Sequence, residues 1–364
     1  MSDFDKNLNK QTNKLSGKLG SKVQKVITLY HPRTLREKGL LWASGLLLIT
    51  YLFITTVLSF WWDIKPDMFD VDRNALETSQ DTQSKMVTGY TTTATIIRVA
   101  ETMLDKPGGY LSNDVTLPGV WMDNMPNWEF GVLVQVRDIV RSLRNDMTRS
   151  QSQSVEDKDL ANAEPQFNFQ NNSWILPATE TEYRTAIEAL NSFLERLSQS
   201  KHQDTQFFAR ADNLRDWLAI VEKRLGSLSQ RLSASIGKTR INTDLAGDSV
   251  ATRSTSTDDE VVVKTPWLEI DDVFNEARGT TWALIHFFKA IETDFSAVLT
   301  KKNAHPSVRQ IIRELEASQE AVWSPMVLNG GGFGIVANYS LVMANYISRA
   351  NAAVIDLRNL LEQG

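Results

Sequence analysis

The feature that most constrains this chain is a long stretch without charge near its N-terminus. It runs from Gly39 to Trp62 and reads GLLWASGLLLITYLFITTVLSFWW. As a helix that rises about 1.5 Å per residue, it is long enough to cross a hydrocarbon core of roughly 30 Å. Trp42 near one end and Trp61 and Trp62 at the other stand where indole rings favour the lipid headgroup layers. We therefore expect residues 39–62 to form a membrane-spanning helix and not the buried helix of a soluble core.

The charges on either side of this stretch predict its direction. Residues 1–38 hold nine Lys or Arg and three Asp or Glu, whereas residues 63–73 hold four aspartates and two basic residues. The cytoplasmic flank of a membrane span is the more basic one, so the N-terminus is expected in the cytoplasm. The stretch is longer than the roughly 7–15 apolar residues of a signal peptide, and SFWWD offers no cleavage site of small residues. We expect an uncleaved signal anchor, with the rest of the chain outside the cytoplasm.

Residues 1–38 form a basic arm with lysines at a spacing of four residues. These are Lys6, Lys10, Lys14, Lys18 and Lys22. On a helix this spacing gives a basic stripe that anionic lipid headgroups would bind, with the interleaved leucines entering the interface. A disordered tail that only sets the topology would explain the same charges. The arm is too short to hold a cytoplasmic signalling domain.

Composition excludes several classes of protein. The basic arm leaves 30 basic and 41 acidic residues for the region after the apolar stretch, a balance that does not suit a nucleic-acid-binding protein. The chain has no cysteine, so disulfides, thiolate metal sites and cysteine nucleophiles are excluded. None of the four histidines has metal-ligand spacing, and His286 in WALIHFFKA is interpreted as a hydrogen-bonded core histidine. With no serine in a GxSxG turn either, we expect no enzyme, catalytic residue, metal or cofactor.

Apolar residues repeat at helical spacing over most of the remaining chain. Helices are predicted over residues 132–147, 180–200, 214–232, 266–300, 306–323 and 335–361. Thr179 with Glu182 suggests a capping box for the second helix, and Thr265 with Pro266 suggests a cap and a first-turn proline for the fourth. The polar segments 148–173 and 237–260 lack this spacing and are expected to be loops or linkers.

The fold class expected is therefore mainly α, with one N-terminal transmembrane helix followed by a helical-bundle domain with long loops. The exported region divides into a first helical part at residues 63–236, a polar linker or loop at 237–264, and a C-terminal helical part at 265–364.

A glycine run near the C-terminus matches part of a dinucleotide-binding fingerprint. It consists of Gly330, Gly331, Gly332 and Gly334, with Ala337 and Asp356 following. That fingerprint needs a strand on each side, whereas here the preceding PMVL is short and the chain ends in a predicted helix. We favour a tight or flexible helix–helix connection, and an anion at the helix N-terminus is the alternative.

Residues 107–131, PGGYLSNDVTLPGVWMDNMPNWEFG, combine glycines, prolines, tryptophans and turn-forming residues, so they are expected to form a folded loop and not a regular helix. The candidate recognition residues in it are Gly108, Gly109, Asn113, Asp114, Trp121, Asp123, Asn124 and Trp128. Its tryptophans either bury themselves in the core, which we favour, or contact a partner. Trp128 precedes an apolar stripe and is expected in the core, whereas Trp121 is expected to be the more exposed.

Three segments resemble a known family: the 107–131 loop with its continuation VLVQVRD, DDVFNEARGTTWALIHFFKAIETDF, and VLNGGGFGIVANYSLVMANYISRA. Together with the single span, they resemble a proteobacterial inner-membrane family of unknown function over nearly the whole chain. The resemblance implies a bacterial inner membrane location with a periplasmic helical domain. It implies no catalytic residue.

The function expected is that of a non-enzymatic cell-envelope protein that acts by contact with another envelope component. Its partners are the lipid bilayer and an envelope protein, and no nucleic acid. The first alternative is a periplasmic ligand-binding or sensing domain, with the 107–131 loop and the glycine run at the mouth of its pocket. The second is an anchored hydrolase, which would need a carboxylate site that the sequence does not reveal.

Overall fold

The computed structural model describes residues 28–150, 155–199, 205–241, 260–321 and 339–363. The described chain is mainly α-helical, as the sequence predicts, with one short hairpin as its only sheet. It divides into two compact units, residues 1–60 and 61–364. The two helical parts on either side of the polar segment 237–264 both belong to the second unit.

The apolar stretch is one helix, α3, which runs from Leu40 to Trp62. It is preceded by the short α2, Pro32–Lys38, and by Gly39, whose φ of +83° allows the chain to turn between the two helices. Thr55 is the one buried residue of α3, and among the described helices α3 alone is long and apolar enough to cross a membrane.

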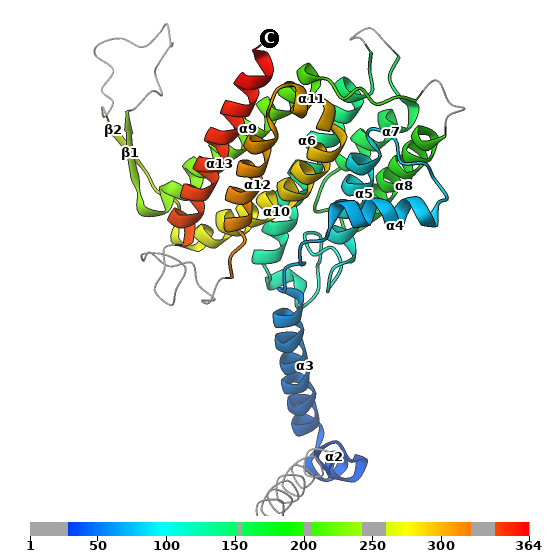
Figure 1. Ribbon diagram of the computed structural model, residues 1–364. Helices are drawn as coiled ribbons and strands as arrows, with labels where there is room; N and C mark the ends of the chain where they lie inside the picture. Colours follow the sequence, from blue (N-terminus) through cyan, green and yellow to red (C-terminus); the bar gives the residue numbers. More distant parts are fainter. Residues whose placement is uncertain (1–27, 151–154, 200–204, 242–259, 322–338, 364) are drawn as a thin grey trace, which may run out of the picture. The chain divides into compact units, whose positions relative to one another are not determined.

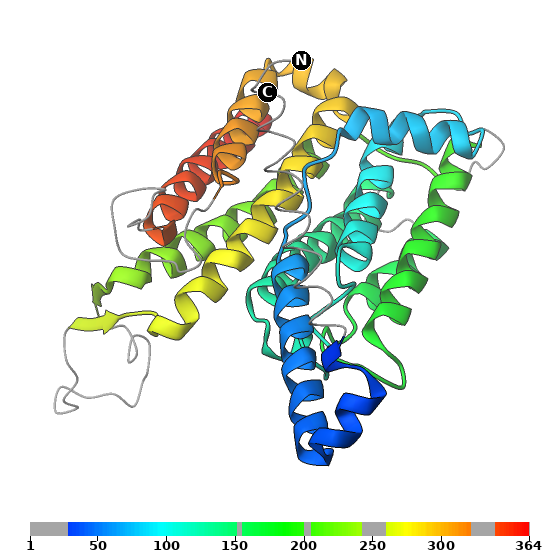
Figure 2. The ribbon, with the colours of Figure 1, turned by 90° about the horizontal axis from the view of Figure 1, so that it is seen from below.

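The second unit is a helical bundle arranged around α10, Ile270–Asp294 (Figure 1). The helices in contact with α10 are α4 (Val71–Asp81), α5 (Tyr90–Asp105), α6 (Asn124–Ser142), α9 (Ala211–Ser233), α11 (Ser296–Lys301), α12 (His305–Ala317) and α13 (Tyr339–Glu362). The pair α7 (Lys158–Phe167) and α8 (Thr179–Ser198) lies on the opposite side of the unit from α12 and α13 (Figure 2). Strands β1, Lys238–Ile241, and β2, Glu260–Val263, pair antiparallel between α9 and α10.

The core follows from the sequence of α10. Every residue from Gly279 to Phe288 is buried, on all sides of the helix, because neighbours surround it. Trp282 packs against Trp128 of α6 with ring centroids 5.2 Å apart, and Phe288 packs against Trp217 of α9 at 5.1 Å. These aromatic contacts join helices that are far apart in the sequence.

The contact between α6 and α10 is unusually close and depends on two glycines. A Cβ atom on Gly279 would lie 2.0 Å from the carbonyl oxygen of Trp128, and one on Gly131 would lie 2.1 Å from that of Glu276. Both obstacles are backbone atoms of the facing helix, which cannot rotate away as a side chain could. The two helices can therefore pack at this distance only because neither residue has a side chain.

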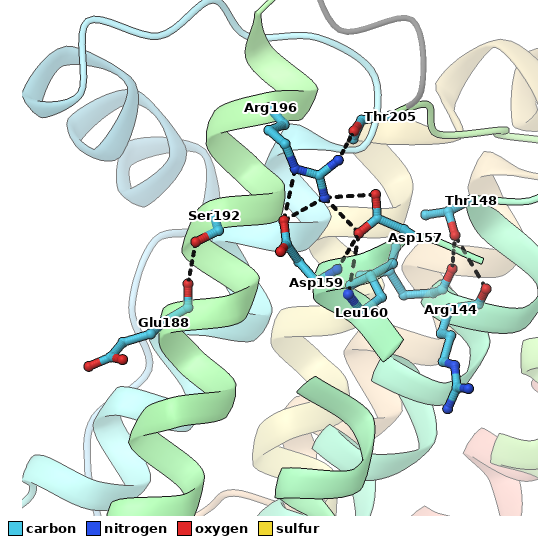
Figure 3. Close-up of polar contacts among 10 residues, drawn as sticks. Arg144, Thr148, Asp157, Asp159, Leu160, Glu188, Ser192, Arg196 and Thr205 are labelled. Atoms are coloured by element: carbon cyan, nitrogen blue, oxygen red, sulfur yellow. Dashed lines mark hydrogen bonds and ion pairs between the residues drawn. The ribbon is translucent and has the colours of Figure 1, made fainter. Parts of the chain in front are cut away.

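The segment 148–173, expected to be a loop, contains the helix α7. Asp157 caps this helix by accepting hydrogen bonds from the backbone amides of Asp159 and Leu160 (Figure 3). Arg196 of α8 then donates to the carboxylates of both Asp157 and Asp159, at 2.7 and 2.8 Å, and also to Thr205. Partners distant in the sequence therefore stabilise a helix whose own pattern is weak.

Other helix boundaries also differ from those expected. Residues 266–300 form a 3₁₀ turn at Trp267–Glu269, then α10 and α11, and neither Thr265 nor Pro266 begins the helix. The capping box at Thr179 is wrong, because Thr179 lies inside α8 and its hydroxyl donates to the Gln170 and Ser173 carbonyls. The edges of the 237–260 segment pair as β1 and β2. The helix predicted at 132–147 begins earlier, at Asn124, and ends in a π-helical turn at Leu143–Met147.

One further helix ends earlier than predicted, and two helices were not predicted at all. The helix after His305 ends at Ala317, whereas the last helix is described from Tyr339 to Glu362, and its predicted start at residue 335 lies outside the described residues. The helices α4 and α5 were missed by sequence reasoning.

The close crossing of α6 and α10 makes a testable prediction. We expect Gly279→Ala to destabilise the protein by about 1–3 kcal/mol or more, because the added methyl group must push two backbones apart. This loss should exceed the gain of about 1 kcal/mol from the higher helix propensity of alanine. Chemical denaturation of the full-length protein in detergent measures the net change in the free energy of unfolding.

The matched control is Gly226→Ala in α9, where a Cβ atom would lie 3.6 Å from the nearest neighbour, the Asn351 side chain. This variant should be as stable as the wild type or more so. Equal stability of the two variants would contradict the close-packing argument.

Candidate functional site: the Trp121 surface

The loop between α5 and α6 begins with two glycines in left-handed conformations. Gly108 has a φ of +88° and Gly109 a φ of +73°. These left-handed conformations turn the chain sharply after the end of α5. The ring of Trp62, the last residue of α3, packs directly on Gly108, where a Cβ atom would lie 2.7 Å from the indole. The first turn of the loop is therefore shaped to receive this tryptophan.

A buried ion pair fixes the loop to α6. The side chains of Lys106 and Glu129 are 1% and 0% exposed and hydrogen-bond directly to each other. The Lys106 ammonium donates its other two protons to the carbonyl oxygens of Met103, at 3.1 Å, and Gly109, at 2.5 Å. Burial lowers the pKa of Lys106, and the charge of Glu129 opposes this effect.

Glu129 uses its remaining acceptor positions on the loop backbone. Its carboxylate accepts from the amides of Leu111 and Ser112 at 2.8 and 2.9 Å and from the Ser112 hydroxyl at 2.5 Å. All three Lys106 protons and both Glu129 oxygens are therefore engaged, which is what a buried charge pair requires. The pair holds residues 106–112 in one conformation.

A second set of contacts ties the loop to the connection between α7 and α8. Asn113 donates to the carbonyl oxygen of Ser173 at 2.9 Å and to Glu180 at 2.6 Å. The Tyr110 hydroxyl donates to the carbonyl oxygen of Asn171 at 3.0 Å. The loop and the connecting segment 171–177 therefore form one structure at the same place on the unit.

The far part of this fixed loop exposes apolar side chains. Val115, Val120 and Trp121 are 54%, 58% and 49% exposed, and we call these three the Trp121 surface. The Asp114 side chain packs on Gly119, which brings the two halves of the surface together. Trp128, in contrast, is fully buried, so the structure places both tryptophans as the sequence predicts.

The remaining candidate residues of the loop have structural roles, and the boundary expected for the loop is wrong. Asn124 begins α6, and Asp123 caps it by accepting from the Asn124 amide at 2.8 Å. Residues 124–131 are therefore helical. An aspartate followed by a proline in the first turn, Asp123 and Pro126, is the signal that would have found this helix start.

Two carboxylates are close to the Trp121 surface in sequence, because Asp114 precedes Val115 and Asp123 follows Trp121 by two residues. Burial, together with the charges of Asp123 and Asp271, raises the pKa of Asp272 to about 6. Burial likewise raises the pKa of Asp114, with Glu129 and Glu180 contributing. These charges disfavour an anionic partner at this surface.

His286 connects the segment after α3 to the core. Its Nδ1 lies 2.7 Å from the Trp282 carbonyl oxygen, and its Nε2 accepts from the Phe69 amide at 3.2 Å. The imidazole also stacks on the Phe69 ring at 4.0 Å. Both nitrogens are therefore engaged, which confirms the prediction of a hydrogen-bonded core histidine.

Two predicted sites lie outside the described residues. They are the glycine run at 330–334 and the lysines of the basic arm at 6–22. Within the ranges that the structure describes, no group of three or more Asp, Glu or His side chains could hold a metal ion.

Sequence reasoning missed a groove between α6, α9 and α10, with a volume of about 390 Å³. Two bidentate ion pairs line it, Asp138 with Arg224 and Glu276 with Arg231. Gln135 also lines it and is 2% exposed, and its Nε2 has no hydrogen-bond partner among the described residues. Nothing in the sequence signals this groove, because its residues come from three distant helices.

Comparison with known proteins identifies the family. The model of the family "Uncharacterized protein conserved in bacteria (DUF2333)" matches residues 35–364, so the chain belongs to this bacterial family. No curated protein and no solved structure matches the chain.

The buried ion pair makes the next prediction. Lys106→Met should destabilise the protein by about 3–5 kcal/mol, because it leaves the Glu129 charge buried without its partner. The control is Arg184→Met, which removes a pair with Asp105 whose side chains are 53% and 54% exposed, and should cost at most about 1 kcal/mol. Chemical denaturation compares the two variants, and similar losses would show that the pair does not fix the loop.

His286 makes stability depend on pH. Burial lowers its pKa to about 4, and Lys289 adds to this shift, whereas the pKa of an unfolded histidine is about 6.5. Between these values the unfolded chain binds a proton that the folded chain does not, so stability is full above pH 6.5 and falls as the pH drops to 4. The loss is about 3 kcal/mol at roughly 1.4 kcal/mol per pH unit.

The variant His286→Gln removes this titration. Melting temperatures of the wild type and of the variant, measured from pH 7 to pH 4, should converge as the pH falls. Parallel curves would show that His286 does not titrate as described.

Proposed function

We propose that this member of the DUF2333 family is a single-pass, non-enzymatic protein of the bacterial inner membrane, which acts by contact through the Trp121 surface. Helix α3 is its signal anchor. The basic arm lies in the cytoplasm and residues 63–364 lie in the periplasm. Two observations support this topology: the length and apolar surface of α3, and the change from basic to acidic charge across it.

The contact role rests on one observation: a loop that is held rigidly but exposes large apolar side chains. Burying the charge pair that fixes residues 106–112 carries a large desolvation cost. Apolar side chains could pack the same part of the core without that cost. A loop fixed in this way loses little conformational entropy when it binds. Exposed tryptophan on such a support is typical of a recognition surface.

The alternative function is binding of a periplasmic ligand, and the Gln135 groove favours it. A buried amide without a partner can donate to a ligand acceptor, and a volume of about 390 Å³ suits a small molecule. The contact function is preferred because the three arginines that line the groove are already paired with carboxylates.

The test uses two reporters and one crosslinker. Alkaline phosphatase fused after residue 70 should be active, and a reporter that works only in the cytoplasm should be inactive there. A photoreactive residue at Val120 should form an adduct in living cells, whereas the same residue at Ser192, exposed on α8, should not. An inactive phosphatase would refute the topology, and equal labelling at both positions would refute the contact surface.

A further inference from the structure

The structure points to the identity of the component that the Trp121 surface contacts. We propose that it is the headgroup layer of the membrane that α3 crosses, with the 106–123 loop and the 171–177 segment resting on it. This inference rests on the proposed function, since it requires α3 to span the membrane.

The position of Trp62 carries the argument. A tryptophan at the end of an apolar helix stands at the level of the lipid headgroups. Trp62 belongs to the second unit and packs on Gly108, so the loop begins within van der Waals contact of a residue at that level. Ile64 follows Trp62 by two residues in the sequence, and it is 57% exposed.

The 171–177 segment adds a second group of exposed apolar side chains. Trp174, Ile175 and Leu176 are all exposed, Leu176 to 90%. Asn113 and Tyr110 hydrogen-bond to the backbone of this segment, so it lies next to the loop that receives Trp62. Two neighbouring loops thus expose tryptophan, valine, isoleucine and leucine beside the end of the anchor. Tryptophan and large aliphatic residues are the side chains that enter the boundary between headgroups and acyl chains.

The surrounding charges define the kind of lipid. Asp114 is next to Val115 in sequence and packs on Gly119, Asp123 follows Trp121 by two residues, and carboxylates repel anionic headgroups. Zwitterionic headgroups carry an ammonium group that these carboxylates attract. We therefore expect contact with zwitterionic phospholipid, and phosphatidylcholine serves as the probe.

The absence of cysteine makes a direct measurement possible, because a single introduced cysteine can be labelled specifically. Nitroxide labels are placed in the full-length protein at Val120→Cys and Leu176→Cys and studied in phosphatidylcholine nanodiscs. Electron paramagnetic resonance then compares collisions with oxygen, which enriches in lipid, with collisions with a water-soluble nickel chelate. Two further labels are references: Ile49→Cys on α3, and Ser192→Cys on α8, about 20 Å along that helix from Thr179.

We expect the ratio of oxygen to nickel collisions at Val120 and Leu176 to be several-fold higher than at Ser192 and lower than at Ile49. If either position is as accessible to nickel as Ser192 while Ile49 is lipid-exposed, the inference of headgroup contact is overturned. The proposal that α3 spans the membrane is then still supported. If Ile49 is itself accessible to nickel, the proposed function fails as well. If the Val120 and Leu176 labels are protected only in native membranes and not in nanodiscs, the contact is with a protein, which also overturns the inference.

Discussion

The close crossing of α6 and α10 determines how the rest of the second unit is arranged. Gly131 and Gly279 let the two backbones approach until each is in contact with a carbonyl group of the other. This crossing places Trp128 against Trp282, and it fixes the direction of the first two turns of α6. Glu129 lies in those turns, so the crossing also sets the position of the one carboxylate that receives Lys106. The loop conformation therefore depends on the two glycines at the crossing, Gly131 and Gly279.

The buried pair specifies the loop more than it stabilises the fold. An apolar pair of similar size could fill the same space at lower desolvation cost. Only a carboxylate, however, can accept the amides of Leu111 and Ser112 while pairing with Lys106. A methionine or leucine at position 129 would leave these amides to find other partners, and the loop would lose its single conformation. The cost of the pair is thus connected to the exposed surface that the loop supports.

The sequence predicts the helices that carry a clear apolar stripe and misses those that depend on partners. The apolar stretch and the stripes at 180–200 and 214–232 correspond to α3, α8 and α9, because their periodicity reflects one buried face. Helix α5 begins YTTTATII, a run of β-branched residues with low helix propensity. It is helical because it packs on α10, and because Asp294 accepts hydrogen bonds from Gly89 and Thr92 at its N-terminus. A carboxylate some 200 residues away cannot be read from the local pattern.

In the candidate site, too, some features are predictable from the local sequence and others depend on tertiary partners. The composition of residues 107–131 indicates a shaped loop, and the context of Trp121 and Trp128 suffices to place one outside and one inside. The Lys106–Glu129 pair is not predictable, because two charged residues 23 positions apart are usually solvated. The contribution of the 171–177 segment is hidden for the same reason, since only the tertiary hydrogen bonds of Asn113 and Tyr110 bring it to the loop.

A single helix constrains the distance of a protein from the membrane but hardly its tilt. A second contact at the headgroup layer, at some lateral distance from the helix axis, would constrain the tilt as well. Two short loops can do this only if they are rigid with respect to the core, since a flexible loop would transmit no orientation. The buried ion pair, the Trp62–Gly108 contact and the Asn113 hydrogen bonds supply that rigidity. If α3 spans a membrane as proposed, such a contact would give the groove at Gln135 a fixed orientation relative to that membrane.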